Sequence, residues 1–442
     1  SLTRSLRFCW LISKHLFLIS YYYLTPVIYP IGFYMRAAQL PVTAKDIFKL
    51  QPKDWVIYNA AIWFYRTTGL WTYPVEASGD LETMTTMDKI YWLYKTVYPI
   101  RRAWKNAGLE DFFARQANSR PAIPDNFSIQ QELSLAAAGD LMIHPYLVNS
   151  GAALYKDVQE LIFGKDIAMA NLECCISEEK NDTLLMRKHT GPALSCHPRA
   201  FAVLNNSGKR PYDFMSAACN HSLDLGVEGA FSTAAVLDEH GTAFHGLNFS
   251  PKDCFKATII EKKHVNIGIL CWTFGLNAKK PPADKPWLVN RLNLNDNSSQ
   301  IDFLGIAKQI EFCHRHKADF IIAQLHWGYE HECYPRPWQI ETAHHLAELG
   351  IDLIIGHHPH VVQPVEYYRT QRDANRVVPI YYSLGNLVNP FSADHLIRSD
   401  VAEIVLAKGM INGEEKTYVR QAVATAVVQQ ADTAQQILRI TI

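Results

Sequence analysis

The chain has 442 residues, of which 48% are hydrophobic, so it can bury a large core and is too long for one ordinary domain. Its 43 Lys and Arg residues balance its 43 Asp and Glu residues, and this neutrality gives no reason to expect nucleic acid or another polyanionic partner. The nine cysteines are scattered, without the spacing of a disulfide framework or of a CxxC zinc site.

The first part of the chain, residues 1–116, is rich in Tyr, Trp and Phe and is expected to form a mainly helical extension. Within it, residues 1–115 carry a net charge of +6. The stretch Leu16–Met35 has no charged residue and is long enough to cross a bilayer, although Pro26 and Pro30 interrupt it. These features predict association with a membrane, on a side that the sequence does not specify.

Two segments of the extension, Trp55–Tyr65 and Ile90–Tyr98, place aromatic residues beside Lys and Arg. An interfacial helical subdomain at a membrane surface has this composition, and so does a helical domain whose aromatic faces pack against the rest of the protein. Both interpretations stay open at this point. Residues 117–130, which contain prolines, are predicted to link the extension to the main domain, residues 131–442.

In the main domain, apolar runs of strand length alternate with helical patterns, which predicts an α/β fold with a largely parallel, buried sheet. The predicted helices, the last of them ended by Gly350, are Val227–Glu239, Ile301–Lys317 and Trp338–Leu349. Near the C-terminus, Asn412-Gly413 is typical of a tight hairpin turn. It predicts two closing strands, Glu403–Lys416 and Tyr418–Gln429.

Polar residues follow five of the predicted strands at the point where each strand ends. Because sites in α/β sheets form beyond the carboxyl ends of strands, these residues are expected to lie along one edge. Carboxylate, amide and imidazole groups are ligands that suit Mn, Fe, Zn or Mg, among which the sequence does not distinguish. The strands with their following residues are Leu133–Ala138 with Asp140, Ile167–Ala170 with Asn171 and Glu173, Phe214–Cys219 with Asn220 and His221, Phe320–Leu325 with His326, and Ile351–Ile355 with His357, His358 and His360.

Each of these motifs alone also has a structural explanation. Asp140 after a glycine is typical of a strand-to-loop turn, and a single His326 is typical of a structural histidine. The pair His358 and His360 is more specific, because Pro359 between them is expected to point both imidazoles toward one centre. The series of five motifs, and not any single one, favours a metal centre.

Six short motifs occur in order over roughly residues 133–390. They are GD at Gly139-Asp140, NLE at Asn171–Glu173, NHSLDLG at Asn220–Gly226, HWGYE at His326–Glu330, GHHPHVVQP at Gly356–Pro364 and YSLGN at Tyr382–Asn386. This series resembles the CapA-type family of capsule (poly-γ-glutamate) biosynthesis proteins, within the calcineurin-like metallophosphoesterase superfamily. The resemblance implies a β-sandwich core flanked by helices, and a centre for one or two divalent metal ions. Residues before 131 have no counterpart in it.

Carried over by position, the resemblance also implies roles for individual residues. His221 is the implied proton donor to the leaving group, with Asp224 as the residue that orients it. The implied metal ligands are Asp140, Glu173, Asn220, His326, His358 and His360. Residues expected to contact substrate or to support the ligands are His144, Asn171, Glu330, His357 and Asn386.

Three positions depart from the usual pattern of the superfamily. Met142 stands where the first motif normally has a histidine, so one ligand is missing unless His144 reaches the centre. Glu173 replaces a bridging aspartate and adds a methylene to the bridge. Ser222 replaces the carboxylate that normally follows the catalytic histidine. These departures also occur in the CapA-type pattern, and they leave ordinary phosphatase chemistry open.

The resemblance leads to two main functional hypotheses. In the first, the protein is a metal-dependent hydrolase that acts on a phosphoester or on a surface-polymer linkage. In the second, it is a non-catalytic accessory component of polymer synthesis or export. A metal-free structural relative is a third interpretation. The expected partner is a surface polymer or a phosphorylated substrate.

Overall fold

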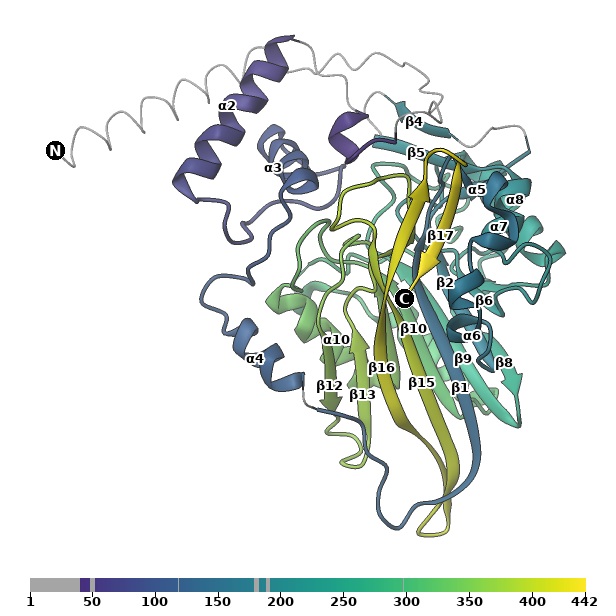
Figure 1. Ribbon diagram of the computed structural model, residues 1–442. Coiled ribbons are helices and arrows are strands. Elements are labelled where there is room, and N and C mark those ends of the chain that lie inside the picture. Colours follow the sequence, from purple (N-terminus) through teal and green to yellow (C-terminus); the bar gives the residue numbers. More distant parts are fainter. Residues whose placement is uncertain (1–39, 48–51, 118, 179–182, 188–190, 297) are drawn as a thin grey trace.

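The computed structural model describes residues 40–442 except 48–51, 118, 179–182, 188–190 and 297. The uncharged stretch Leu16–Met35 lies outside the described residues. Two β-sheets pack face to face, and helices lie along their outer sides (Figure 1). The predicted fold class, an α/β protein with a β-sandwich core flanked by helices, is confirmed.

The larger sheet has eight strands in the order β17-β16-β15-β1-β2-β6-β7, with β14 beside β1. β1, β2, β6, β7 and β14 pair in parallel with one another, whereas β15, β16 and β17 are antiparallel to their neighbours. The bounds are β1 (Ser128–Leu141), β2 (Ile167–Leu172), β6 (Phe214–Ser216), β7 (Ala243–His245), β14 (Asn386–Val388), β15 (Arg398–Ile411), β16 (Glu414–Asp432) and β17 (Ile437–Thr441).

The second sheet has six strands in the order β12-β13-β11-β10-β9-β8. Its four central strands are parallel, and both edge strands, β8 and β12, are antiparallel. The bounds are β8 (Thr258–Lys262), β9 (Val265–Thr273), β10 (Phe320–His326), β11 (Leu353–His357), β12 (Val365–Arg369) and β13 (Val377–Tyr381). A small third sheet contains β3 (Cys175–Ile176), β4 (Thr183–Arg187) and β5 (Gly191–Cys196).

The layer between the two large sheets is a continuous apolar core. Every residue of β10 and β11 is buried, as expected for parallel strands that are covered on both faces. The larger sheet contributes side chains such as Leu135 and Met169, and the second sheet contributes Ile269, Ile322 and Ile355. Burying one such side chain stabilises the fold by about 1.5–3 kcal/mol, so this layer holds the two sheets together.

The outer face of each sheet is covered by its own helices. The larger sheet packs against α5 (Leu147–Ser150), α6 (Gln159–Ile162), α7 (Pro198–Leu204) and α8 (Gly226–Glu239). The second sheet packs against α9 (Leu304–Arg315) and α10 (Pro337–Leu349), and Gly350 after α10 has a φ of 128°. The three helices predicted for this domain correspond to α8, α9 and α10, with ends that differ by up to three residues.

The predicted C-terminal hairpin is present, but its first strand begins and ends earlier than predicted and its second strand is longer. Asn412 and Gly413 have φ values of 51° and 82°, which a two-residue turn of the primed type requires. The two strands on either side are β15 and β16, and β15 begins five residues before the predicted Glu403. β15 begins earlier because it pairs with β1 as well as with β16. The local sequence does not reveal this pairing.

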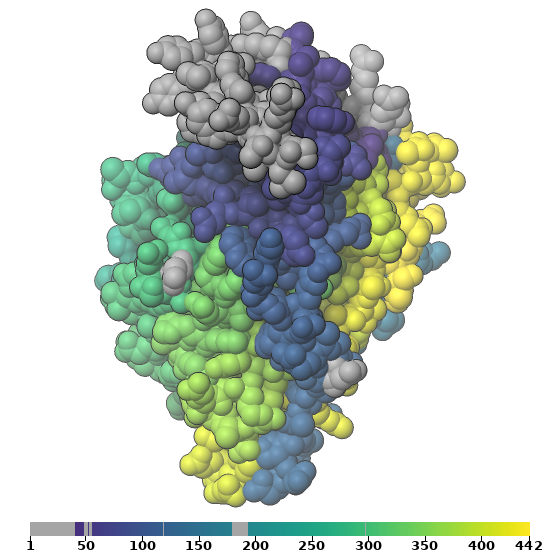
Figure 2. All heavy atoms as spheres, turned by 90° about the vertical axis from the view of Figure 1, so that its left-hand side faces the viewer, coloured from purple at the N-terminus to yellow at the C-terminus, as the bar shows by residue number. Residues whose placement is uncertain are grey.

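The N-terminal extension contains α2 (Pro52–Thr68), α3 (Thr86–Val97) and α4 (Leu109–Gln116) among its described residues. Figure 2 shows α2 and α3 lying across one end of the main domain, with α4 along its side. On α3, Tyr91 and Tyr94 are buried in a cluster with Trp71. On α2, Trp55 and Trp63 are exposed by 55% and 69%.

None of the helices in the described part of the chain is both long and apolar enough to cross a bilayer.

Candidate metal centre

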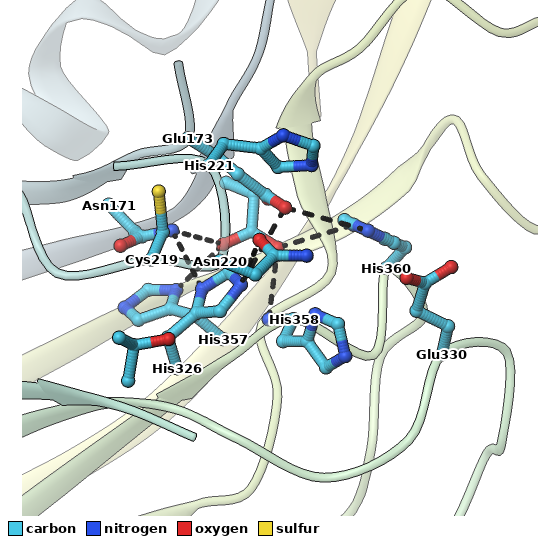
Figure 3. A network of polar contacts seen from close by, with 12 residues as sticks. Asn171, Glu173, Cys219, Asn220, His221, His326, Glu330, His357, His358 and His360 are labelled. Atoms are coloured by element: carbon cyan, nitrogen blue, oxygen red, sulfur yellow. Dashed lines mark hydrogen bonds and ion pairs between the residues drawn. The ribbon is translucent and has the colours of Figure 1, made fainter. Parts of the chain in front are cut away.

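Strands from both sheets end at the same edge of the sandwich and bring the predicted site residues together. Asp140 on β1 lies in register with Asn171 on β2 and with Asn386 on β14. In the second sheet, His326 at the end of β10 lies in register with His357 at the end of β11. Residues separated by more than 200 positions therefore meet in one polar cluster (Figure 3).

Two glycines allow the backbones to approach closely at this edge. A Cβ atom on Gly139, next to Asp140, would lie 2.1 Å from the carbonyl oxygen of Gly385. A Cβ atom on Gly356 would lie 2.0 Å from the carbonyl oxygen of Tyr382. Both distances are far below van der Waals contact, so the GD and GH motifs require glycine at these two positions for the backbones to pack this closely.

Asp140 is fully buried at the centre of the cluster. Asn171 Nδ2 donates to its Oδ1 over 2.9 Å, and the backbone N–H of His358 donates to its Oδ2 over 3.2 Å. His357 Nδ1 lies 3.1 Å from Oδ1, and His360 Nδ1 lies 3.5 Å from Oδ2. Burial acts to raise the pKa of Asp140, but His357 and His360 hold it well below its usual value. Asp140 is therefore an ionised carboxylate.

Glu173 follows β2 and is fully buried, yet neither of its carboxylate oxygens has a hydrogen-bond partner among the described residues. It belongs to two groups whose candidate ligand atoms lie within 4.8 Å of one another, one with His326 and His358 and one with Asp140 and His360. Metal–ligand bonds are about 2.0–2.2 Å long, so each group is compact enough to surround one ion. His326 Nε2 and His360 Nε2 lie 3.6 Å and 3.7 Å from Glu173 Oε1, too far for a hydrogen bond. A buried carboxylate without hydrogen bonds is costly, and a divalent cation would offset that cost. The residues fit a metal centre in which Glu173 is shared.

His326 is placed between two asparagines. Its Nε2 lies 3.0 Å from Asn220 Oδ1, and Asn171 Nδ2 lies 3.3 Å from its Nδ1. Asn220 and His221 do not directly follow a strand, because β6 ends at Ser216. The loop after β6 nevertheless carries Asn220 into the cluster, where its amide oxygen is positioned beside an imidazole ligand.

His358 and His360 have backbone conformations that favour glycine, with φ values of 95° and 58°. His358 Nδ1 is buried and has no hydrogen-bond partner in the described part of the chain. His360 Nδ1 lies 2.9 Å from Asn386 Oδ1, an acceptor that keeps the proton on Nδ1 and leaves Nε2 available as a ligand. Strained backbone and unpartnered ring nitrogens at one position are typical of a functional site.

Burial and charge determine which groups are ionised in this cluster. Burial lowers the pKa values of His326 and His358 well below their usual range, so both are neutral imidazoles, the form that binds metals. Burial opposes ionisation of His360 too, but the carboxylates of Glu173 and Asp140 raise its pKa to about 10. Burial, together with the charge of Asp140, raises the pKa of Glu173 well above its usual value. The proton on His360 balances the negative charge of the neighbouring carboxylates. A bound cation would balance that charge in its place.

His221 lies beside the ligands and forms a separate hydrogen-bonded pair. Its Nδ1 is 2.6 Å from Asp224 Oδ2, and its Nε2 is 3.5 Å from Asn277 Nδ2. Asp224 also accepts from Lys279 Nζ over 2.5 Å. Burial acts to raise the pKa of Asp224, but His221 and Lys279 lower it, so the carboxylate is charged and can stabilise an imidazolium.

His144 is placed apart from the candidate ligands. Its Nδ1 accepts from the backbone N–H of Tyr146 over 3.0 Å, and burial lowers its pKa to about 3. It belongs to none of the metal-competent groups found in the described residues. Met142, at the position of the usual first histidine, is buried in the apolar core. Among the described residues, no candidate ligand group therefore includes a histidine of this loop.

Glu330 lies at the outer side of the cluster and forms a third metal-competent group with His358 and His360. Its carboxylate accepts a hydrogen bond from Trp92 Nε1 of the extension. Three residues that contact predicted site residues were not anticipated from the sequence: Trp92, Asn277 and Lys279. Trp92 lies outside the motifs and Lys279 in a polar loop, so neither carries a local signal of its role.

The fold and the cluster define a two-sheet α/β protein with a buried centre of carboxylates and imidazoles. The chain belongs to the family of the bacterial capsule synthesis protein PGA_cap, whose model matches residues 134–390. The CapA-type resemblance stated from the motifs is thereby confirmed.

Individual relatives share moderate sequence identity with the chain. It is 28% identical over 267 residues to the PGA biosynthesis protein CapA of Bacillus subtilis (strain 168), a match that covers 58% of this chain and 63% of that protein. It is 24% identical over 273 residues to the capsule biosynthesis protein CapA of Bacillus anthracis, covering 58% and 60%. The match thus spans less than two thirds of the length of these relatives.

Among solved structures, the calcineurin-like phosphoesterase YfkN from Bacillus subtilis is similar, with a TM-score of 0.36 and 16% identity. That similarity covers 67% of this chain and 90% of the solved chain.

Proposed function

We propose that the protein is a metal-dependent hydrolase of capsule or surface-polymer biosynthesis, acting on a phosphoester or on a linkage of a poly-γ-glutamate-like polymer. The observation that carries the proposal is the buried carboxylate of Glu173, which has no hydrogen bond among the described residues and is shared by two groups of candidate ligands. Membership of the capsule synthesis family supports the biological setting.

The residues that would hold the ions are Asp140, Glu173, Asn220, His326, His358 and His360. Divalent ions at such a centre lower the pKa of bound water and polarise a phosphoryl or carbonyl group. Asn386 and Asn171 orient the ligands through hydrogen bonds to His360 and Asp140.

His221 is the proposed proton donor to the leaving group. Asp224 accepts from Nδ1 and fixes the ring, so that Nε2 is the nitrogen that carries the transferable proton. The charge of Asp224 stabilises the protonated ring, and Lys279 forms an ion pair with the same carboxylate. In this proposal His221 donates a proton and does not bind the metal ions.

A non-catalytic role is the second candidate. Two relatives from Mycobacterium tuberculosis, 24% identical over 240 residues, are named probable polyglutamine synthesis accessory proteins. The chain also has Met142 in place of a usual ligand, which favours weaker or altered metal binding. In this alternative the centre would support a surface that binds polymer or a protein of the export machinery.

One purified sample can separate these candidates. Metal content would be measured on the full-length protein, and the same sample would be assayed on a generic phosphodiester and on γ-linked glutamate oligomers. Turnover that disappears on chelation and returns with added metal supports the hydrolase. A fully metallated protein with no turnover on either substrate class supports the accessory role, and a protein without metal contradicts the proposed centre.

We also propose that the extension associates with a membrane surface. Support comes from the +6 charge of residues 1–115 and from the exposed Trp55 and Trp63 of α2. Basic residues near an anionic leaflet contribute about 1 kcal/mol each, and interfacial tryptophans add apolar burial.

A further inference from the structure

The N-terminal extension reaches the outer side of the metal centre through α3. Trp92, on this helix, donates its indole N–H to Glu330 Oε2 over 2.5 Å. His331 Nε2 lies 3.6 Å from the same oxygen. Both contacts engage Oε2, which leaves Oε1 of Glu330 available as a ligand atom.

The position of α3 is fixed by contacts that follow Trp92 along the chain. Lys95, one turn further along α3, forms a 2.8 Å ion pair with Glu332, and both side chains are buried. Arg336 also binds Glu332 over 2.8 Å. After the helix, Ile100 N–H donates to the carbonyl oxygen of His331 over 2.9 Å. The extension and the loop after β10 are therefore held together at the point where Glu330 projects.

Glu330 differs from the other candidate ligands in its exposure. Its side chain is 20% exposed, whereas that of Glu173 is fully buried. With His358 and His360 it forms a group whose ligand atoms lie within 4.8 Å of one another. One ring nitrogen of His358, Nδ1, is buried without a hydrogen-bond partner among the described residues. Figure 3 shows Glu330 on the side of His360 that lies away from Glu173 and Asn171.

We propose that Glu330 is the outermost ligand of a divalent cation and that Trp92 is the positioning residue that holds its carboxylate there. The extension, which precedes the region matched by the family model, thereby completes the metal centre of this chain. The inference rests on the proposed function, because it assumes that the centre binds metal. An oxygen with two imidazole nitrogens suits Mn, Fe or Zn.

The test measures Mn²⁺ binding to the full-length protein by equilibrium dialysis. Trp92→Phe keeps an aromatic ring and removes the indole donor, and Glu330→Gln keeps the shape and removes the charge. Each variant is expected to bind Mn²⁺ about 10–100-fold more weakly at one position, the usual effect of losing a supporting contact of a metal ligand. Trp63→Phe, on the exposed face of α2, is the matched control and is expected to keep the affinity of the unmodified protein.

The double variant Trp92→Phe, Glu330→Gln separates positioning from general destabilisation. If Trp92 acts through Glu330, the double variant binds Mn²⁺ as weakly as Glu330→Gln alone, and its melting temperature matches that of Trp92→Phe. Additive losses, or unchanged affinity in Trp92→Phe, overturn the inference while leaving the proposed function intact. An unmodified protein that binds no Mn²⁺, Zn²⁺ or Fe²⁺ overturns the proposed function and the inference with it.

Discussion

Two of the three histidines of the GHHPHVVQP motif, His358 and His360, have positive φ values. His358 has a φ of 95°, which L-residues adopt at a cost of about 1–3 kcal/mol. Comparison of His358→Ala with His358→Gly isolates this cost, because both substitutions remove the imidazole and only glycine relieves the backbone. We expect the glycine variant to have the larger free energy of unfolding, by about 1 kcal/mol, measured by urea titration of the metal-free proteins.

The sign of this difference makes the test specific. At an ordinary backbone position glycine is about 0.5–1 kcal/mol less stable than alanine, so the opposite order is expected only if the φ of the folded protein is truly positive. Equal stability of the two variants, or a more stable alanine variant, would show that His358 stores no strain.

His221 provides a residue-scale test of the proposed chemistry. His221→Ala is expected to lower turnover by about 10²–10⁴-fold, the usual contribution of a positioned acid or base. Metal content should not change, since His221 is hydrogen-bonded to Asp224 and belongs to none of the metal-competent groups in the described residues. Rate measurements and metal analysis on the same variant check both statements. Loss of metal together with activity would mean that His221 is a ligand.

At the scale of elements, β15 carries an ionisable group at an unfavourable position. Burial raises the pKa of Asp400 to about 6, compared with about 3.9 in an unfolded chain. The folded protein therefore keeps this proton between about pH 4 and 6 while the unfolded chain releases it, so the stability contribution of Asp400 falls as pH rises through that window.

Asp400→Asn should remove this penalty. At pH 7 we expect the variant to be more stable than the unmodified protein by on the order of 2 kcal/mol, and at pH 4 the two should converge. Urea titrations at both pH values, read as the difference between the two proteins, measure the effect. A difference that is the same at pH 4 and pH 7 would show that ionisation of Asp400 does not oppose folding.

For the whole molecule, the open question from composition was whether the aromatic extension is a membrane-binding unit or a cover for the main domain. The two helices differ in this respect. α3 pairs Lys95 with Glu332 of the main domain, which supports the cover, whereas Tyr91 and Tyr94 are buried in a cluster of the extension's own residues. α2 leaves Trp55 and Trp63 exposed, which supports a surface for binding.

The membrane proposal can be tested on α2 without disturbing α3. Replacing Trp55 and Trp63 together by serine should reduce binding to vesicles containing phosphatidylserine, measured by co-sedimentation, with little change in melting temperature. Vesicles of phosphatidylcholine alone serve as the control for charge. Unchanged binding of the double variant would exclude α2 as the contact. Deleting residues 1–115 is a poorer test, because it would remove Lys95 from the buried Glu332.

The fold class and the family could be predicted from the sequence because both depend on local patterns. Runs of apolar residues predict buried strands wherever the strands are placed, and GHHPHVVQP or HWGYE can be recognised without knowing what they contact. Helix ends and the hairpin at Asn412-Gly413 were also close to the structure, since capping and turn preferences act over a few residues.

Only the tertiary structure could decide which residues meet. The lack of hydrogen bonds to Glu173, the positive φ values of His358 and His360, and the grouping of the candidate ligands all depend on how strands from two sheets end at one edge. The contact of Trp92 with Glu330 joins positions separated by 238 residues. Such long-range contacts are set by packing of whole sheets and helices, and neighbouring residues along the chain carry no information about them.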